Sequence, residues 1–432
     1  MTRTPKFLAM LALTAGAALV VSSTGMGLQA QQGAPSYRFD PEWPKTLPNN
    51  WKNGGITGLA VDANDNVWAY NRPNDLTAVE LHEEVGLADC CVRPPSMIHF
   101  DKEGNVIGSF DAPQGHGMDV DSKGFVYLGQ DTVRKYDPRT GKVVAEIERT
   151  PVRENGQPAG LQPWPPKRNP GQGGRGPVAG FLPDPPGAKP PDPAAQAKAR
   201  ERVAAFRKKY PPQTPMIVGG LEEIRVVERD NEIYVADNYL GGRILVFDFN
   251  TLAFKRGWGA YGKPLAQISI DDATREYTPG GPMPKDFAGH LTVNVSNDGL
   301  VYAADRNANR IHVTDRNGKF IQEFKLAEMT GVGGSTGGVG FSPDKEQRFL
   351  YISDLTNNHI WFLNRADGKV VGQMGSMGEN GGQFFGLHMI AVDSRGNIYT
   401  GEVFAGERVQ RFVPANSPRG KVLQQLSKTP LF

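Results

Sequence analysis

Ile233-Tyr234-Val235-Ala236-Asp237, followed by Arg243-Ile244-Leu245-Val246-Phe247-Asp248, shows the unit from which the fold is built. Each segment is a short run of β-branched and aromatic residues, and a glycine-containing turn separates the two, which is typical of adjacent antiparallel strands. Strands of this kind, centred on one aromatic residue, recur along the chain. The recurring aromatic residues are Trp68, Tyr127, Tyr234, Tyr302, Tyr351 and Tyr399. Repeats of three or four short strands are typical of propeller blades, so six copies predict an all-β, six-bladed β-propeller.

The composition agrees with one propeller extending over residues 31–432. The 52 glycines and 34 prolines suit a fold with many tight turns. The formal net charge is only +2, so the sequence gives no indication of a nucleic-acid partner. A closed ring of blades leaves no long exposed sheet edge, and we expect the chain to be a monomer.

Residues 1–30 have the features of a secretory signal peptide. Arg3 and Lys6 precede an apolar run from Phe7 to Val21, and small residues follow up to Ala30. A basic start, an apolar core of this length and a small residue at the cleavage point are typical of such a peptide. We therefore expect a secreted or periplasmic protein with no membrane contact beyond this segment. An uncleaved membrane anchor is the alternative interpretation.

Two insertions interrupt the repeat. Residues 151–215, between blades 2 and 3, are so rich in proline and glycine that we expect no packed core there, and only residues 194–210 favour a short, exposed, basic helix. Residues 259–288 join blades 3 and 4. Long loops on a propeller face often shape a binding site.

The two cysteines, Cys90 and Cys91, are adjacent. They are too few to form a zinc framework, and in an oxidising compartment they can form a vicinal disulfide or stay reduced. We interpret them as a local loop feature rather than as reactive groups.

Three of the seven histidines share one position in the repeat, eleven or twelve residues before the blade aromatic. They are His116, His290 and His388, in blades 2, 4 and 6. The same position corresponds to Thr57 in blade 1, to Glu223 in blade 3 and to the glycines around Gly337 in blade 5. This position begins the innermost strand of each blade, and alternate blades are one third of a turn apart. We therefore expect the three histidines to face one another across the channel.

Three imidazoles with an open fourth position are a typical catalytic zinc site, so the sequence predicts zinc held by this trio. Polar side chains that merely line the channel are the alternative. Glu223 is a candidate for a carboxylate that orients a ligand or acts as a base, although Glu222 beside it leaves the register open. The histidines outside this position are assigned no metal: His82, His99, His312 and His359.

These segments resemble two known groups of propellers. The Val-Asp and Tyr-Val-x-Asp strands resemble the NHL-repeat class over nearly all of residues 50–415. The histidine positions resemble those of the peptidyl-α-hydroxyglycine α-amidating lyase family, which binds zinc through three histidines. The resemblance implies that Tyr239, in Asp237-Asn238-Tyr239, is a catalytic tyrosine. It also implies that Arg72, in Tyr70-Asn71-Arg72, is a catalytic arginine.

The chain also departs from that family. The family's calcium site uses an aspartate directly after the third histidine, where this chain has Met389, so the expectation of Ca²⁺ is weak. A family methionine is replaced by Gly386, the family's disulfides are absent, and residues 151–215 have no counterpart there.

The leading hypothesis is a secreted zinc-dependent carbon–nitrogen lyase that acts on a small-molecule or peptide-like substrate. It would split an α-hydroxylated amide into an amide and an α-keto acid. A metal-dependent hydrolase such as a lactonase is one alternative, although calcium lactonases favour oxygen ligands over imidazoles. A propeller that only binds partners is the other, and it predicts that the three histidines can be replaced without loss of function.

Overall fold

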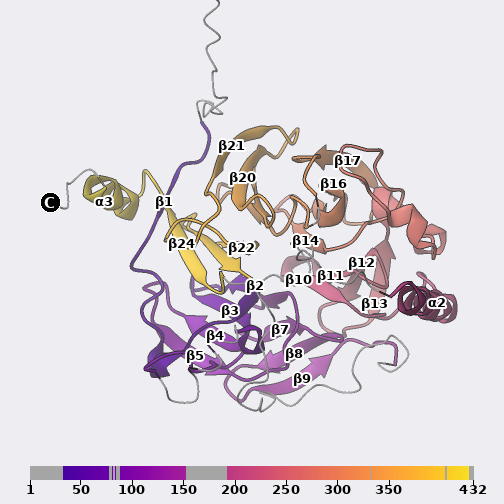
Figure 1. Cartoon of the computed structure of the whole chain (residues 1–432), viewed down its shortest axis with the longest axis horizontal. Coiled ribbons are helices and arrows are strands. Elements are labelled where there is room, and N and C mark those ends of the chain that lie inside the picture. The colour runs from indigo at the N-terminus through magenta and orange to yellow at the C-terminus, as the bar shows by residue number, and fades with distance from the viewer. Residues whose placement is uncertain are drawn as a thin grey trace, which may run out of the picture.

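Six four-stranded antiparallel sheets are arranged around a central axis in the computed structural model (Figure 1). The structure describes residues 33–76, 80, 83, 88–151, 192–331, 333–403 and 406–427. The predicted six-bladed propeller is confirmed. Residues 1–30, most of the 151–215 insertion and His82 lie outside the described residues, so the signal peptide stays a prediction.

Each of the first five blades is a meander of four consecutive strands, with the first strand innermost. Blade 1 contains β2 (Gly55–Val61), β3 (Val67–Arg72), β4 (Met97–Phe100) and β5 (Val106–Phe110), and blade 2 contains β6 (Met118–Val120), β7 (Val126–Gly129), β8 (Val133–Asp137) and β9 (Lys142–Glu146). Blade 3 contains β10 (Leu221–Val227), β11 (Glu232–Asp237), β12 (Arg243–Asp248) and β13 (Phe254–Trp258). Blade 4 contains β14 (Leu291–Val295), β15 (Val301–Asp305), β16 (Arg310–Thr314) and β17 (Phe320–Lys325), and blade 5 contains β18 (Val339–Phe341), β19 (Phe349–Asp354), β20 (His359–Asn364) and β21 (Val370–Met374).

Blade 6 closes the ring with strands from both ends of the described chain. It contains β22 (Leu387–Val392), β23 (Ile398–Glu402) and β24 (Val409–Pro414), and its outermost strand is β1 (Tyr37–Phe39). β1 pairs with β24 in antiparallel register. The carboxylate of Asp40, directly after β1, is fully buried and accepts hydrogen bonds from Arg411 and Arg419, each at 2.6 Å. This contact holds the two ends of the chain together.

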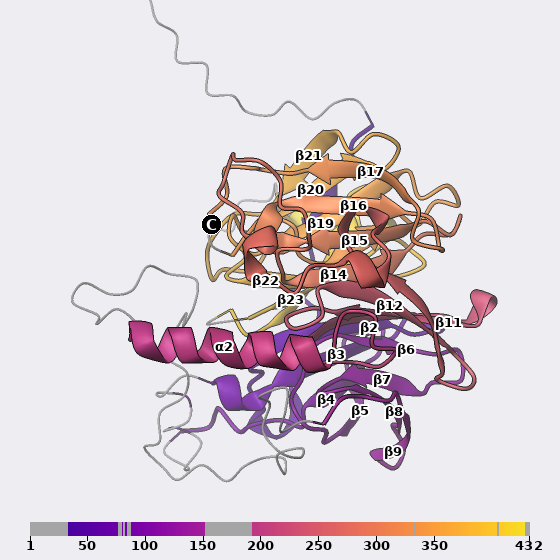
Figure 2. The same cartoon turned by 90° about the vertical axis from the view of Figure 1, so that its right-hand side faces the viewer.

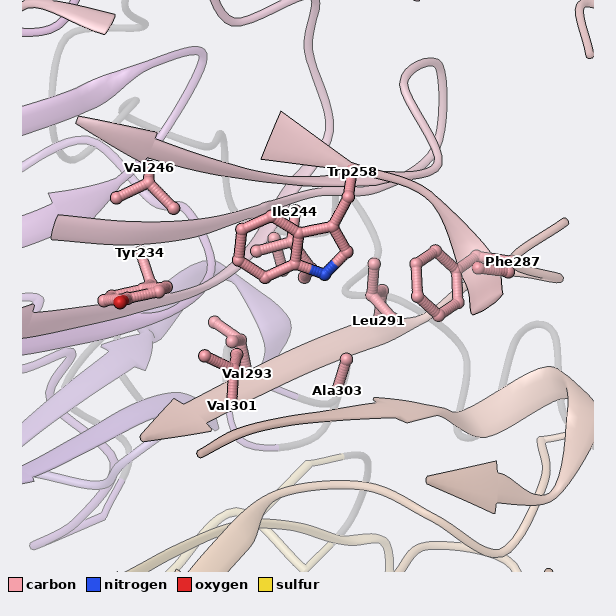
Figure 3. Close-up of a cluster of buried hydrophobic side chains, with 11 residues drawn as sticks. Tyr234, Ile244, Val246, Trp258, Phe287, Leu291, Val293, Val301 and Ala303 are labelled. Atoms are coloured by element: carbon pink, nitrogen blue, oxygen red, sulfur yellow. The ribbon is translucent and has the colours of Figure 1, made fainter. Parts of the chain in front are cut away.

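The hydrophobic core lies between the blades. Figure 3 shows the layer between blades 3 and 4, where Trp258 and Ile244 face Leu291 and Val293. Phe287, the penultimate residue of the 259–288 loop, is 1% exposed and belongs to the same cluster. The end of that loop is therefore anchored in the core. The loop itself contains the short helices η4 (Ala260–Gly262), η5 (Leu265–Gln267) and η6 (Asp272–Arg275).

Two α-helices lie outside the ring of blades. Helix α2 (Pro193–Lys209) confirms the expected helix at 194–210, and Figure 2 shows it along the side of the molecule. Its side chains are mostly exposed, but Phe206 and Arg207 in the last turn are buried. Helix α3 (Pro418–Leu426) packs beside β1 and β24. Within the described residues, no helix combines the length and apolarity needed to span a bilayer.

The remaining short helices are η1 (Pro48–Asn50), η2 (Pro73–Asp75), η3 (Glu228–Asp230) and η7 (Arg306–Ala308). Cys90 and Cys91 form a vicinal disulfide in the connection between β3 and β4. This answers the question that the sequence left open, and it places the pair in a loop as expected.

Candidate metal centre

The start of the innermost strand is irregular in most blades, and this irregularity directs side chains toward the axis. In blades 1, 3 and 6 the strand pairing skips one residue, so that Thr57, Glu222 and His388 are each an extra residue in a β-bulge. A bulge changes the direction of the side chain that it carries. In blade 4, His290 directly precedes the strand and adopts a positive φ of 53°, and in blade 2 only Gly117 separates His116 from the strand.

His116 and His388 come together at the axis. Their Nε2 atoms are 3.3 Å apart. The Nδ1 atom of His116 lies 2.6 Å from the backbone oxygen of Glu222. Because a carbonyl oxygen can only accept, His116 donates its Nδ1–H to this oxygen, and Nε2 of the neutral ring carries a lone pair. Metal-ligating histidines typically have this arrangement, with the other ring nitrogen held by a carbonyl or carboxylate oxygen.

His290 is held by the side chain of the same glutamate. Its Nδ1 atom lies 2.9 Å from Glu222 Oε1 and 3.0 Å from the hydroxyl oxygen of Tyr239. Since a carboxylate only accepts, His290 donates Nδ1–H to Glu222, which leaves the lone pair on Nε2. Asn238 donates to the other oxygen of Glu222 at 2.9 Å. Glu222 thus fixes the ring orientation and tautomer of two of the three predicted ligands.

The carboxylate beside the histidines is therefore Glu222, and the expectation for Glu223 is corrected. The bulge in β10 lies between Leu221 and Glu223, so the residue aimed at the histidines is one position earlier than the count from Tyr234 indicates. Glu223 is also buried, but its Oε1 accepts from Arg225 at 3.1 Å.

Burial dominates the electrostatics of this centre. It lowers the pKa of His116 to about 4 and that of His388 well below its usual value. Both rings are therefore neutral at pH 7, as ligands must be. Burial alone would raise the pKa of Glu222, but its interactions with His116 and His290, including the hydrogen bond from His290, and the charge of Arg306 lower this pKa well below its usual value. Glu222 is ionised.

Tyr239 is placed at the centre, as the resemblance implies. It follows β11 in a loop, its side chain is 47% exposed, and its hydroxyl group contacts His290. Burial of the hydroxyl and the charge of Glu222 raise the pKa of Tyr239, whereas Arg306 and Arg72 oppose this increase. A phenolate at this position therefore depends on nearby positive charge.

Arg72 ends β3 and donates through Nε and Nη2 to the oxygen of Gly115, each at 3.2 Å. It thus lies beside His116 and contributes to lowering the pKa of that histidine. Arg306, which the sequence analysis did not select, is 2% exposed, and its backbone nitrogen donates to the oxygen of His290 at 3.3 Å. A signal for it exists, because Arg72 follows Trp68 by four residues and Arg306 follows Tyr302 by four.

The residues fit a zinc ion. Nitrogen atoms of His116 and His388 and a carboxylate oxygen of Glu222 lie within 4.8 Å of one another. His290 does not belong to this compact group, although its hydrogen bond to Glu222 places it directly beside the group. Neutral imidazoles with an adjacent carboxylate are a donor set that zinc prefers. Met389 is buried in the core between blades 6 and 1 and offers no oxygen to a calcium ion.

The other described histidines have contacts elsewhere. His99 stacks on Trp68 with 3.9 Å between ring centroids, and His359 contacts the backbone oxygen of Gly375. His312 is paired with Glu323 at 3.0 Å. None of these three contacts involves the channel centre.

Comparisons with known proteins assign the chain to no family. No protein-family model matches the chain, and no curated protein matches it. A structural genomics protein of unknown function from Bacteroides thetaiotaomicron VPI-5482 has a TM-score of 0.47 and 14% identity, over 84% of this chain and 70% of its own. A catalytically inactive variant of virginiamycin B lyase from Staphylococcus aureus, with quinupristin, has a TM-score of 0.41 and 10% identity, over 88% of this chain and 89% of its own.

This chain is a six-bladed β-propeller with a distant structural neighbour that is named as a lyase. Similarity at this level carries no argument about activity. The resemblances to the NHL-repeat class and to the amidating lyase family are not confirmed by these comparisons and remain interpretations of the sequence.

Proposed function

We propose that the chain is a metal-dependent carbon–nitrogen lyase that splits a small α-hydroxylated amide into an amide and an α-keto acid such as glyoxylate. The observation that carries the proposal is the hydrogen-bonding of the centre. His116 and His290 each direct Nδ1–H to Glu222, so that both rings keep a lone pair on Nε2, and Tyr239 lies within hydrogen-bonding distance of His290. Histidines held in this way, beside a residue that can transfer a proton, form a catalytic centre rather than a channel lining.

In this proposal His116, His290 and His388 hold a zinc ion, and Glu222 orients two of them. A bound zinc ion would polarise an oxygen of the substrate as a Lewis acid. Glu222 is the other candidate ligand, because it belongs to the compact group with His116 and His388. Its hydrogen bonds from His290 and Asn238 favour the orienting role, since they already occupy one direction on each oxygen.

Arg72 and Arg306 bind the carboxylate of the substrate. They occupy the same repeat position in blades 1 and 4, which lie on opposite sides of a six-bladed ring. Both charges act on Tyr239 and on His388, so both arginines add positive potential at the centre. Guanidinium groups are suited to carboxylates because their parallel N–H groups match the two oxygens.

Tyr239 moves the proton. Its phenolate oxygen takes the proton of the substrate's α-hydroxyl group, the carbon–oxygen bond becomes a carbonyl, and the carbon–nitrogen bond breaks with its electron pair on nitrogen. Tyr239 then returns the proton to this nitrogen, which gives the neutral amide. Arg72 and Arg306 favour the phenolate, because both oppose the rise of the pKa of Tyr239.

The test is release of glyoxylate from N-acetyl-α-hydroxyglycine by the zinc-loaded protein. Replacement Tyr239→Phe should lower kcat by about 10²–10⁴-fold, the usual contribution of general acid–base catalysis, with an unchanged zinc content. Tyr37→Phe is the matched control, because the hydroxyl group of Tyr37 contacts Tyr351 at the outer edge of the ring. Equal rates for Tyr239→Phe and the wild type would refute the role of Tyr239. No glyoxylate from any such substrate would refute the proposed reaction.

A further inference from the structure

A cavity of about 250 Å³ opens beside Tyr239. It is lined by Arg207 of helix α2, by the loop after β11, by the 259–288 loop and by the segments around His290 and Arg306. The lining residues are Arg207, Asn238, Tyr239, Asp272, Arg275, Glu276, Ala288, Gly289 and Asn307. Sites for whole small ligands usually measure about 300–1,000 Å³, so this cavity has room for one end of a small substrate.

Arg207 lines one wall of this cavity, and its guanidinium group already has protein partners. Its guanidinium group donates to the backbone oxygens of Tyr239 at 3.2 Å and Leu240 at 3.1 Å, and to Asp272 Oδ1 at 2.5 Å. The last turn of α2 therefore holds the loop that carries Tyr239. The charges of Arg207 and Asp272 neutralise each other.

Arg275 is different, because no carboxylate in the described part of the chain forms an ion pair with it. The residue is 9% exposed, and its hydrogen bond within the described residues is the one from Nη2 to the oxygen of Gly241 at 3.3 Å. Its Nε is buried without a hydrogen-bond partner in that part of the chain. The guanidinium group packs against Gly242, where a Cβ atom would lie 2.7 Å from Nη1.

Two other arginines of blades 3 and 4, both fully buried, have aspartate partners. Arg243 pairs with Asp237 at 2.9 Å, and Arg310 pairs with Asp305 at 3.0 Å. Burial of a cation without a partner is costly, because the lost hydration is not replaced. An arginine left in this state on a cavity wall is expected where a ligand supplies the missing anion.

The remaining acids around Arg275 do not fill this role. Asp286 is bonded to Lys263 at 2.8 Å, and Glu276 is exposed, so that solvent screens its charge. Burial and the charge of Arg207 lower the pKa of Arg275, but only to about 10, which leaves it protonated at neutral pH.

We propose that Arg275 binds an anionic group on the acyl side of the substrate. This inference rests on the proposed function and narrows its substrate class to α-hydroxylated amides whose acyl chain ends in a carboxylate. The cavity shares Tyr239 with the metal centre, so a substrate that reacts at Tyr239 extends one end into it. The carboxylate next to the reacting carbon lies with Arg72 and Arg306, and the acyl end reaches Arg275.

Binding of two unreactive analogues tests the proposal without catalysis. N-succinylglycine carries a carboxylate on its acyl chain, and N-acetylglycine lacks it. Calorimetry with the zinc-loaded protein should show at least about 10-fold tighter binding of N-succinylglycine, as a charge-assisted guanidinium–carboxylate contact provides. Equal affinities in the wild type would overturn the proposal, and this result requires no variant.

The variant Arg275→Gln should reduce the preference for N-succinylglycine to less than about 2-fold. Arg139→Gln is the matched control, because Arg139 has an 85% exposed side chain on an outer turn of blade 2 and should keep the preference. A preference that survives in Arg275→Gln would also overturn the proposal. Circular dichroism of each variant confirms that it is folded.

Failure of this inference and failure of the proposed function can be told apart by measuring glyoxylate release from N-succinyl-α-hydroxyglycine and from N-acetyl-α-hydroxyglycine. A binding preference without turnover would refute the lyase and leave the role of Arg275 intact. Equal turnover of both compounds, with equal binding of both analogues, would refute the role of Arg275 and leave the lyase intact.

Discussion

Replacing Glu222 by glutamine removes one charge from the centre and preserves its shape. Glu222 is 1% exposed and accepts hydrogen bonds from His290 and Asn238, each at 2.9 Å. In the wild type, Asn238 donates a hydrogen bond to the carboxylate of Glu222. The amide NH₂ group of the new glutamine would face this donor, so it needs an acceptor there instead. Asn238 Oδ1 is buried without a hydrogen-bond partner in the described part of the chain, so a flip of that side chain supplies the acceptor. We therefore expect Glu222→Gln to fold.

The size of the effect on zinc follows from the hydrogen bond to His290. A bond to a charged acceptor contributes roughly 1.5–3 kcal/mol, and a bond to a neutral acceptor contributes about 0.5–1.5 kcal/mol. The difference of about 1–2 kcal/mol corresponds to roughly 5–30-fold weaker zinc binding. Loss of an orienting carboxylate typically has a similar effect, about 10–100-fold.

Competition with a chromogenic zinc chelator measures this affinity for the wild type and for Glu222→Gln. A decrease of about 10-fold, with one zinc still bound per chain at saturation, is the expected result. Complete loss of zinc would refute the reasoning, because it would make Glu222 a ligand rather than the residue that orients His290. An unchanged affinity would show that the hydrogen bond has no influence on the centre.

Three further predictions concern other parts of the molecule. Burial alone would raise the pKa of Glu323, but hydrogen bonds from His312 and Tyr261 lower this pKa to about 2. As the pH falls, the unfolded chain therefore takes up a proton at this residue near pH 4.5, whereas the folded chain takes it up only near pH 2. Through this group the wild type should lose up to about 3 kcal/mol of stability as the pH falls from 4.5 to 2. Glu323→Gln, measured by urea unfolding, should be less stable than the wild type at pH 7 and should lose correspondingly less stability over that pH range. Asp40→Asn weakens the contacts that hold β1 in place, because it leaves partly buried arginines poorly paired. It should lower the free energy of unfolding by about 2 kcal/mol. An unchanged Tm would contradict the closure of the ring through β1. Arg72→Gln should raise KM for N-acetyl-α-hydroxyglycine about 10-fold, with a constant zinc content, and an unaltered KM would remove Arg72 from the binding of the carboxylate.

The fold was predictable because a propeller repeats its pattern. The aromatic residue of each second strand and the turn before it recur six times, and each copy predicts the same blade. β1 could not be predicted in this way, because a strand of only three residues, Tyr37–Phe39, precedes the first copy of the repeat. Its pairing with β24 depends on closure of the whole ring.

The repeat position also predicted which histidines approach the axis, but it could not give the local register. The bulge adds one residue within β10, between Leu221 and Glu223, and nothing in the sequence distinguishes Glu222 from Glu223 at that point. Arg72 lies four residues after the aromatic residue of its blade, and a search for arginines at this position in all six blades would have found Arg306. Arg207 and Arg275 belong to the two insertions, which have no repeat, so only the structure places them beside Tyr239.

The zinc content of the protein is the decisive test of the three-histidine site. Elemental analysis should be made on the protein without residues 1–30 after zinc reconstitution and dialysis, for the wild type and for His290→Ala, with Arg139→Gln as the control. About one zinc per chain is expected in the wild type and in the control, and loss of that zinc is expected in His290→Ala. A wild type without stoichiometric zinc would contradict the metal centre, and full retention of zinc by His290→Ala would contradict the three-histidine site.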